Sequence, residues 1–175
     1  MSYNIKHIHS HKKGNVVTIY LPNFCLNQLS KETTVQIIDI LERVNKDDHV
    51  NMVVFRTVQE NFFLPKFSLE EAPIISDSIM NSDYFINLKD MIHSMRAMTV
   101  SVIEGATNKI GSSFIKASDL SYATESTVFS NGMNIDGNQL FTAEKAEENG
   151  IITRMIPEDK IDLTLDYLGH TYESE

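Results

Sequence analysis

The sequence has little cysteine and little positive charge, and it has no tryptophan. The single cysteine, Cys25, excludes a disulfide within the chain and is typical of a reducing compartment. Lysine and arginine together number 15, against 24 acidic residues, which gives a formal net charge of -9. Because binding to phosphate backbones needs clustered cationic side chains, this balance argues against a nucleic-acid partner.

Long apolar runs are missing as well. No segment approaches the roughly 20 apolar residues that cross a bilayer, and the basic N-terminus is not followed by the apolar segment of a signal peptide. The composition, with 42% hydrophobic and 22% charged residues, is that of a globular protein with a core. We therefore expect a single cytoplasmic domain over residues 1–175, with no membrane segment.

The apolar periodicity alternates between strand and helix. Residues 3–12 and 16–21 flank Lys13-Gly14-Asn15, a pattern typical of a hairpin. Ser30 is placed to cap a helix that carries apolar residues at 3.6-residue spacing up to Val44, and a buried strand is expected at 50–55. Strand, helix and strand in this order predict a right-handed crossover with parallel pairing.

The second half repeats the same alternation. The patterns predict, in order, a helix at 83–97, a strand at 100–103, a turn at 105–111, a short helix at 112–118 and a strand at 120–123. Thr142 is placed to cap a brief helix that ends at Asn149-Gly150. A strand at 151–156 and a helical stretch at 161–168 complete an α/β chain without internal repeats.

Four segments, in one order, resemble motifs of the enoyl-CoA hydratase/isomerase (crotonase) superfamily. Residues 26–30, LNQLS, are similar to its LNALS segment, and residues 50–65 resemble the strand and loop that follow. Residues 100–123 resemble the AAVnGyalGGG segment with its next strand, and residues 142–157 resemble sAeeAlelGLVdrVvP. The resemblance implies an α/β fold with the crotonase-like (ClpP/crotonase) β-β-α spiral core. Because only 161–168 reads as helical after Pro157, it also implies that most of the C-terminal helical region is lacking.

In that family two backbone N–H groups hold a thioester oxygen as it gains negative charge, and the resemblance places them at Leu64 and Ile110. A helix N-terminus suits this role because its N–H groups and its dipole favour an anion. The resemblance implies a thioester of coenzyme A or phosphopantetheine as the ligand, with no permanently bound cofactor. Leu26 and Asn27 match the segment that contacts the carrier. Lys66 is a candidate partner for a substrate carboxylate; the alternative is a lysine that is merely solvated.

The two glutamates that hydratases use as acid and base fall, by the same match, on Ser113 and Met133. Methionine cannot transfer a proton, and serine is no general base at neutral pH without a partner. Ordinary hydration is therefore not expected. Two hypotheses stay open: a lyase-like or isomerase-like protein that binds a thioester through the two N–H groups, or a non-catalytic pseudoenzyme that acts in assembly.

The other candidate sites favour structural roles. His7, His9 and His11 alternate along one strand and chelate poorly from there, so we expect a solvated strand and no metal. Glu104 and Asp119 are expected to hold the fold through hydrogen bonds rather than to act as acids. A chain without the C-terminal helices exposes apolar core surface, so we expect a homo-oligomer, either a trimer or a hexamer.

Overall fold

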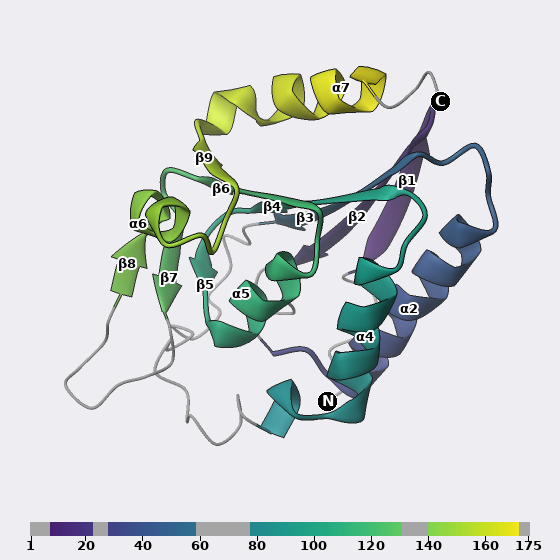
Figure 1. The fold of residues 1–175 in the computed structure, drawn as a ribbon, viewed down its shortest axis with the longest axis horizontal. Coiled ribbons are helices and arrows are strands. Elements are labelled where there is room, and N and C mark those ends of the chain that lie inside the picture. Colours follow the sequence, from purple (N-terminus) through teal and green to yellow (C-terminus); the bar gives the residue numbers. More distant parts are fainter. Residues whose placement is uncertain (1–7, 23–27, 59–77, 131–139, 172–175) are drawn as a thin grey trace.

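The computed structural model describes residues 8–22, 28–58, 78–130 and 140–171. Within these ranges the main sheet has six strands in the order β1-β2-β3-β4-β6-β9 (Figure 1). The strands are β1 (His9–Lys13), β2 (Val16–Pro22), β3 (Met52–Val58), β4 (Met98–Ile103), β6 (Leu120–Thr124) and β9 (Arg154–Ile156). The first two strands form the predicted hairpin, with Gly14 at a φ of 62° in its turn. All other neighbours pair in parallel, as the strand-helix-strand pattern predicts.

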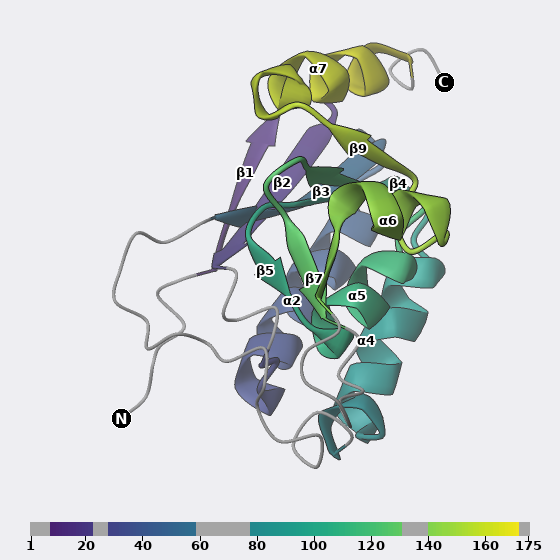
Figure 2. The ribbon, with the colours of Figure 1, turned by 90° about the vertical axis from the view of Figure 1, so that its left-hand side faces the viewer.

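Helices cover both faces of this sheet. The helices α2 (Lys31–Asn45), α4 (Asp83–His93) and α5 (Lys109–Lys116) lie on one face, and α7 (Ile161–Thr171) crosses the other (Figures 1 and 2). Ser30 caps α2 as predicted, since its hydroxyl accepts the N–H of Thr33 at 3.1 Å. A short 3-10 helix, η2 (Glu158–Lys160), leads into α7.

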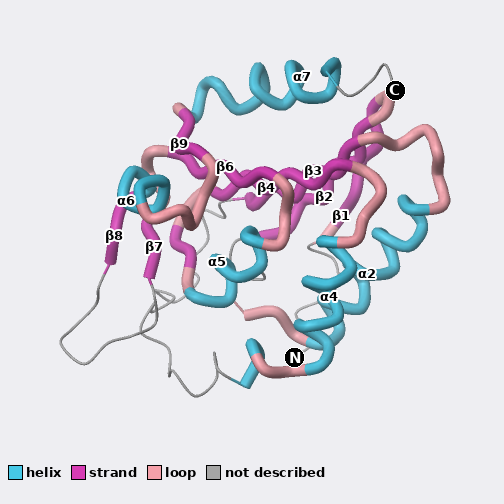
Figure 3. The backbone as a smooth tube through the Cα atoms, in the orientation of Figure 1, coloured by secondary structure: helices cyan, strands magenta, loops and turns pink. Residues whose placement is uncertain are grey.

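A smaller sheet stands beside the main one (Figure 3). It consists of β5 (Ala106–Thr107), β7 (Val128–Ser130) and β8 (Leu140–Thr142), in the order β5-β7-β8. The chain enters it directly after β4 through Gly105, whose φ of 94° is one that residues with a side chain rarely adopt. Thr142 then caps α6 (Ala143–Glu148), as predicted, by accepting the N–H of Lys145 at 3.2 Å.

The core is divided by the main sheet. Alternate residues of β3, including Val53 and Phe55, pack with α2, α4 and α5, while Met52 and Val54 pack towards α7. Phe55 meets Phe114 of α5 edge to face, with ring centroids 5.1 Å apart. Burial on both faces is usual for parallel strands and explains their nearly continuous apolar sequences.

Several element boundaries differ from the predictions, and three of these differences have a visible physical cause. The helix expected at 83–97 ends at His93, where Ser94 caps it. The turn expected at 105–111 contains β5 and the first turn of α5, because Asn108 caps that helix. The strand expected at 151–156 begins at Arg154, since the Ile151 N–H still bonds the Ala146 carbonyl at the end of α6.

Candidate functional site

The strands that lead into the predicted site segments end at one edge of the fold. β2 and β3 end opposite one another, with Pro22 paired to Val58, and β7 ends at Ser130. Ligands in open α/β sheets bind beyond the carboxyl ends of the parallel strands. The start of α5, reached from β4 through β5, is the described part of the predicted site.

Five of the predicted site residues lie outside the described residues. They are Leu26, Asn27, Leu64, Lys66 and Met133. Their proposed roles therefore stay predictions from the sequence. Ile110 and Ser113 are described, and both belong to α5.

The N-terminus of α5 directs two N–H groups at one oxygen. The amides of Ile110 and Gly111 both donate to the side-chain carbonyl Oδ1 of Asn108, at 3.0 and 3.1 Å. No acidic residue stands in the first turn of α5, although such residues are favoured there by the helix dipole. In this structure the predicted oxyanion donor Ile110 is thus occupied by a neutral carbonyl oxygen of the chain itself.

Apolar packing fixes where this helix begins. Ile110, Phe114 and Ile115 are almost completely buried, and they anchor α5 on the main sheet.

Thr107, next to the cap residue Asn108, is also fully buried. Its hydroxyl has no hydrogen-bond partner in the part of the chain that the structure describes. An unsatisfied hydroxyl of this kind is rare in folded proteins.

Ser113 lies beside a cation. Lys89 of α4 donates from Nζ to the Ser113 hydroxyl at 3.3 Å, and its ammonium lies 4.9 Å from the centroid of the Phe85 ring. Both Lys89 and Ser113 are half-buried. The position that the sequence match assigns to a hydratase glutamate therefore holds a hydroxyl next to a positive charge. Lys89 was not predicted from the sequence, because nothing local shows that α4 brings it against α5.

Asp119 has the structural role that we expected. Its carboxylate accepts the N–H and the hydroxyl of Thr99 at 2.9 and 3.2 Å, and its own N–H donates back to the Thr99 hydroxyl at 2.9 Å. These bonds join the start of β4 to the residue before β6.

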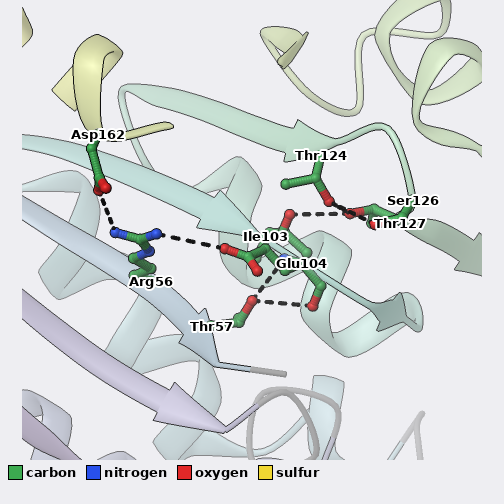
Figure 4. A network of polar contacts seen from close by, with 8 residues as sticks. All are labelled: Arg56, Thr57, Ile103, Glu104, Thr124, Ser126, Thr127 and Asp162. Carbon is green, nitrogen blue, oxygen red and sulfur yellow. Dashed lines mark hydrogen bonds and ion pairs between the residues drawn. The ribbon is translucent and has the colours of Figure 1, made fainter. Parts of the chain in front are cut away.

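Glu104 also serves the fold, in a network between β3, β4 and α7 (Figure 4). Its N–H donates to the Thr57 hydroxyl at 2.8 Å, and its carboxylate lies 3.8 Å from Arg56, which also pairs with Asp162 at 3.0 Å. Burial raises the pKa of the Glu104 carboxyl above its usual value, and the nearby Arg56 charge opposes that rise. Since Arg56 ties it to α7, this carboxyl is directed away from α5.

The N-terminal hairpin borders a cleft under α7. This cleft has a volume of about 510 Å³, and Tyr20, Arg56 and His170 are among its lining residues. All five residues of β1 are exposed, and His9 stacks on Tyr20 with ring centroids 4.9 Å apart.

Among the described residues no three metal-ligating side chains converge, and His7 lies outside these residues.

No protein-family model matches the sequence, and no curated protein matches it. Solved structures do match. An enoyl-CoA hydratase from Mycobacterium smegmatis aligns with a TM-score of 0.76 at 16% identity, over 96% of this chain and 77% of that chain. An enoyl-CoA hydratase/isomerase family protein from Silicibacter pomeroyi aligns with a TM-score of 0.74 at 17% identity, over 96% and 84%. An enoyl-CoA hydratase from Bacillus anthracis gives 0.73 at 15% identity, over 97% and 77%.

This chain has the crotonase fold. The fold predicted from four sequence motifs is thereby confirmed, and almost the whole chain takes part in it. The alignments cover 77% and 84% of these neighbours' chains, so the neighbours are longer than this chain. None of the helices in the described ranges is long and apolar enough to span a membrane.

Proposed function

We propose that this protein binds an acyl thioester of coenzyme A or of phosphopantetheine, with the thioester carbonyl at the N-terminus of α5. The supporting observation is the convergence of the Ile110 and Gly111 N–H groups on the single carbonyl oxygen of Asn108. Like that amide oxygen, a thioester carbonyl oxygen accepts hydrogen bonds and donates none. In the bound state the Asn108 side chain turns away, and the ligand oxygen takes its place.

The remaining contacts follow the sequence match. The match assigns the second donor to the amide of Leu64 and the contact with the pantetheine to Leu26 and Asn27. It makes Lys66 a candidate partner for a substrate carboxylate. The single cysteine supports a cytoplasmic location for this protein.

The proposed site lacks the acid and the base of a hydratase. Ser113 accepts a hydrogen bond from the Lys89 ammonium, and Met133 has no transferable proton. We therefore expect the thioester to bind without being hydrated. Of the chemistries open to such a site, isomerisation or decarboxylation depends most on the stabilised oxygen.

Isothermal titration calorimetry with two matched ligands tests the proposal. One is butyryl-CoA, and the other is S-butyl-CoA, a thioether without the carbonyl oxygen. Only the thioester can accept from the Ile110 amide, so it should bind more tightly. Equal affinity for both ligands would refute a role for this donor, and no binding of either at millimolar concentration would refute thioester binding.

Variants of Asn108 sharpen this test. Asn108→Gly leaves the helix cap only a few tenths of a kcal/mol weaker, yet it removes the competing oxygen. Thioester affinity should then rise, by about five-fold if the competing bonds contribute about 1 kcal/mol. Asn108→Asp puts a carboxylate on the same two donors, binds them more strongly and should weaken the thioester complex. The thioether serves as the control, because its affinity should stay constant across the series.

A second candidate function is assembly, either with further copies of this chain or as a non-catalytic partner. The observation that favours it is on α7, where Leu163 and Tyr167 lie one helical turn apart with 65% and 71% of their surfaces exposed. Apolar side chains paired on one helix face in this way are typical of interfaces. We propose a homo-oligomer, either a trimer or a hexamer.

A further inference from the structure

Lys89 carries a charge that no carboxylate of the described residues balances. Lys12, Arg43, Arg56 and Lys145 all form ion pairs with carboxylates. Lys89 instead donates to the hydroxyl of Ser113 at 3.3 Å and lies against the Phe85 ring. A half-buried ammonium without a counter-charge attracts an anion, and this one stands in a protein whose net charge is -9.

Ser113 completes an anion-binding pair. Its oxygen accepts the hydrogen bond from Lys89, so its own O–H is available to donate to a further oxygen. The ammonium and the hydroxyl together offer two donors to one carboxylate. Charge-assisted hydrogen bonds of this kind are stronger than neutral ones.

The distance from the proposed carbonyl position suits a short acyl chain. Ser113 follows Ile110 by three residues, which is about 4.5 Å along a helix and close to one full turn, so both positions lie on the same side of α5. The proposed position of the carbonyl oxygen, now held by Asn108 Oδ1, lies a further 3.0 Å from the Ile110 nitrogen. A carboxylate separated from the thioester carbonyl by two or three carbons spans the distance from that position to Ser113. We propose, on the basis of the function proposed above, that the site selects acyl thioesters whose acyl group ends in a carboxylate, and that Lys89 with Ser113 binds it.

Titration of the full chain with succinyl-CoA and butyryl-CoA tests this inference, because the two acyl groups have the same number of carbons and differ in the carboxylate. Succinyl-CoA should bind at least about ten-fold more tightly, the effect expected of a charge-assisted contact. Lys89→Gln should remove that preference, so that succinyl-CoA then binds about as tightly as butyryl-CoA. Lys116→Gln, which removes an exposed lysine from the end of α5, the helix that carries Ser113, is the matched control and should preserve the preference.

The outcomes separate the two proposals. Equal affinity of the native chain for the two thioesters would overturn the inference and leave thioester binding intact. A Lys89→Gln variant that weakens both thioesters alike, or that keeps the preference for succinyl-CoA, would also overturn it. Failure of both thioesters to bind would overturn the proposed function itself. Thermal unfolding of each variant, measured alongside, should match the native protein and thereby exclude a loss of folding.

Discussion

Replacing Thr107 by valine removes a buried hydroxyl that has no hydrogen-bond partner among the described residues. Valine has nearly the same shape, so the packing around β5 is kept. A buried polar group left without a partner costs about 1–3 kcal/mol. Taking the lower end of that range, we expect Thr107→Val to raise the free energy of unfolding by about 1 kcal/mol. For a chain of this size, that corresponds to an increase in Tm of about 2–4 °C.

Thr99 provides the matched control. It is only 1% exposed, yet its hydroxyl bonds both the N–H and the carboxylate of Asp119 at 2.9 and 3.2 Å. Thr99→Val therefore makes the same chemical change with the opposite expected sign, a loss of about 1–3 kcal/mol. Urea unfolding of both variants measures whether the two free energies of unfolding change in opposite directions. If Thr107→Val destabilises the protein as much as Thr99→Val does, the Thr107 hydroxyl is bonded and the reasoning fails.

Three further predictions concern chemistry, charge and assembly. The sequence match puts Ser113 and Met133 at the positions of the two glutamates, so crotonyl-CoA hydration should equal the uncatalysed background. A turnover number of about 1–10³ per second would contradict the motif match. Burial raises the pKa of Glu104 above its value in the unfolded chain. The stability that this group contributes is therefore fully present below the pKa of the unfolded state. It is lost as the pH rises through the pKa of the folded state. Glu104→Gln should therefore raise Tm near about pH 7 and have less effect near about pH 4, in scanning calorimetry; a lower Tm near neutral pH would contradict it. Light scattering at micromolar concentration should show an oligomer that Tyr167→Glu weakens, whereas a stable monomer would count against assembly.

Local signals predicted much of the fold correctly. Ser30 and Thr142 were identified as helix caps because a cap bonds an N–H only three residues away, which a sequence window contains. The parallel pairing of β2 and β3 followed from the strand-helix-strand order. The predicted start of α5 is too late, because Gly111 is typical of a turn, although Asn108 is a favoured cap. The strands β7 and β8 were missed because each contains only three residues.

The candidate site depends on contacts that no sequence window contains. Lys89 and Ser113 are separated by 24 residues, and they meet only because α4 and α5 pack on the same face of the sheet. The occupation of the Ile110 amide by Asn108 is local, yet it becomes visible only once the start of the helix is known. The resemblance predicts roles for Ile110 and Ser113 of α5, and the structure shows which groups surround them.

A crystal structure of the protein, determined after soaking with butyryl-CoA, tests directly whether the thioester binds at the N-terminus of α5. The thioester oxygen should lie within hydrogen-bond distance, about 2.7–3.2 Å, of the Ile110 nitrogen. The Asn108 side chain should then have left its present position, 3.0 Å from that nitrogen. A bound ligand whose carbonyl lies elsewhere, with Asn108 still accepting from Ile110, would contradict thioester binding at the N-terminus of α5.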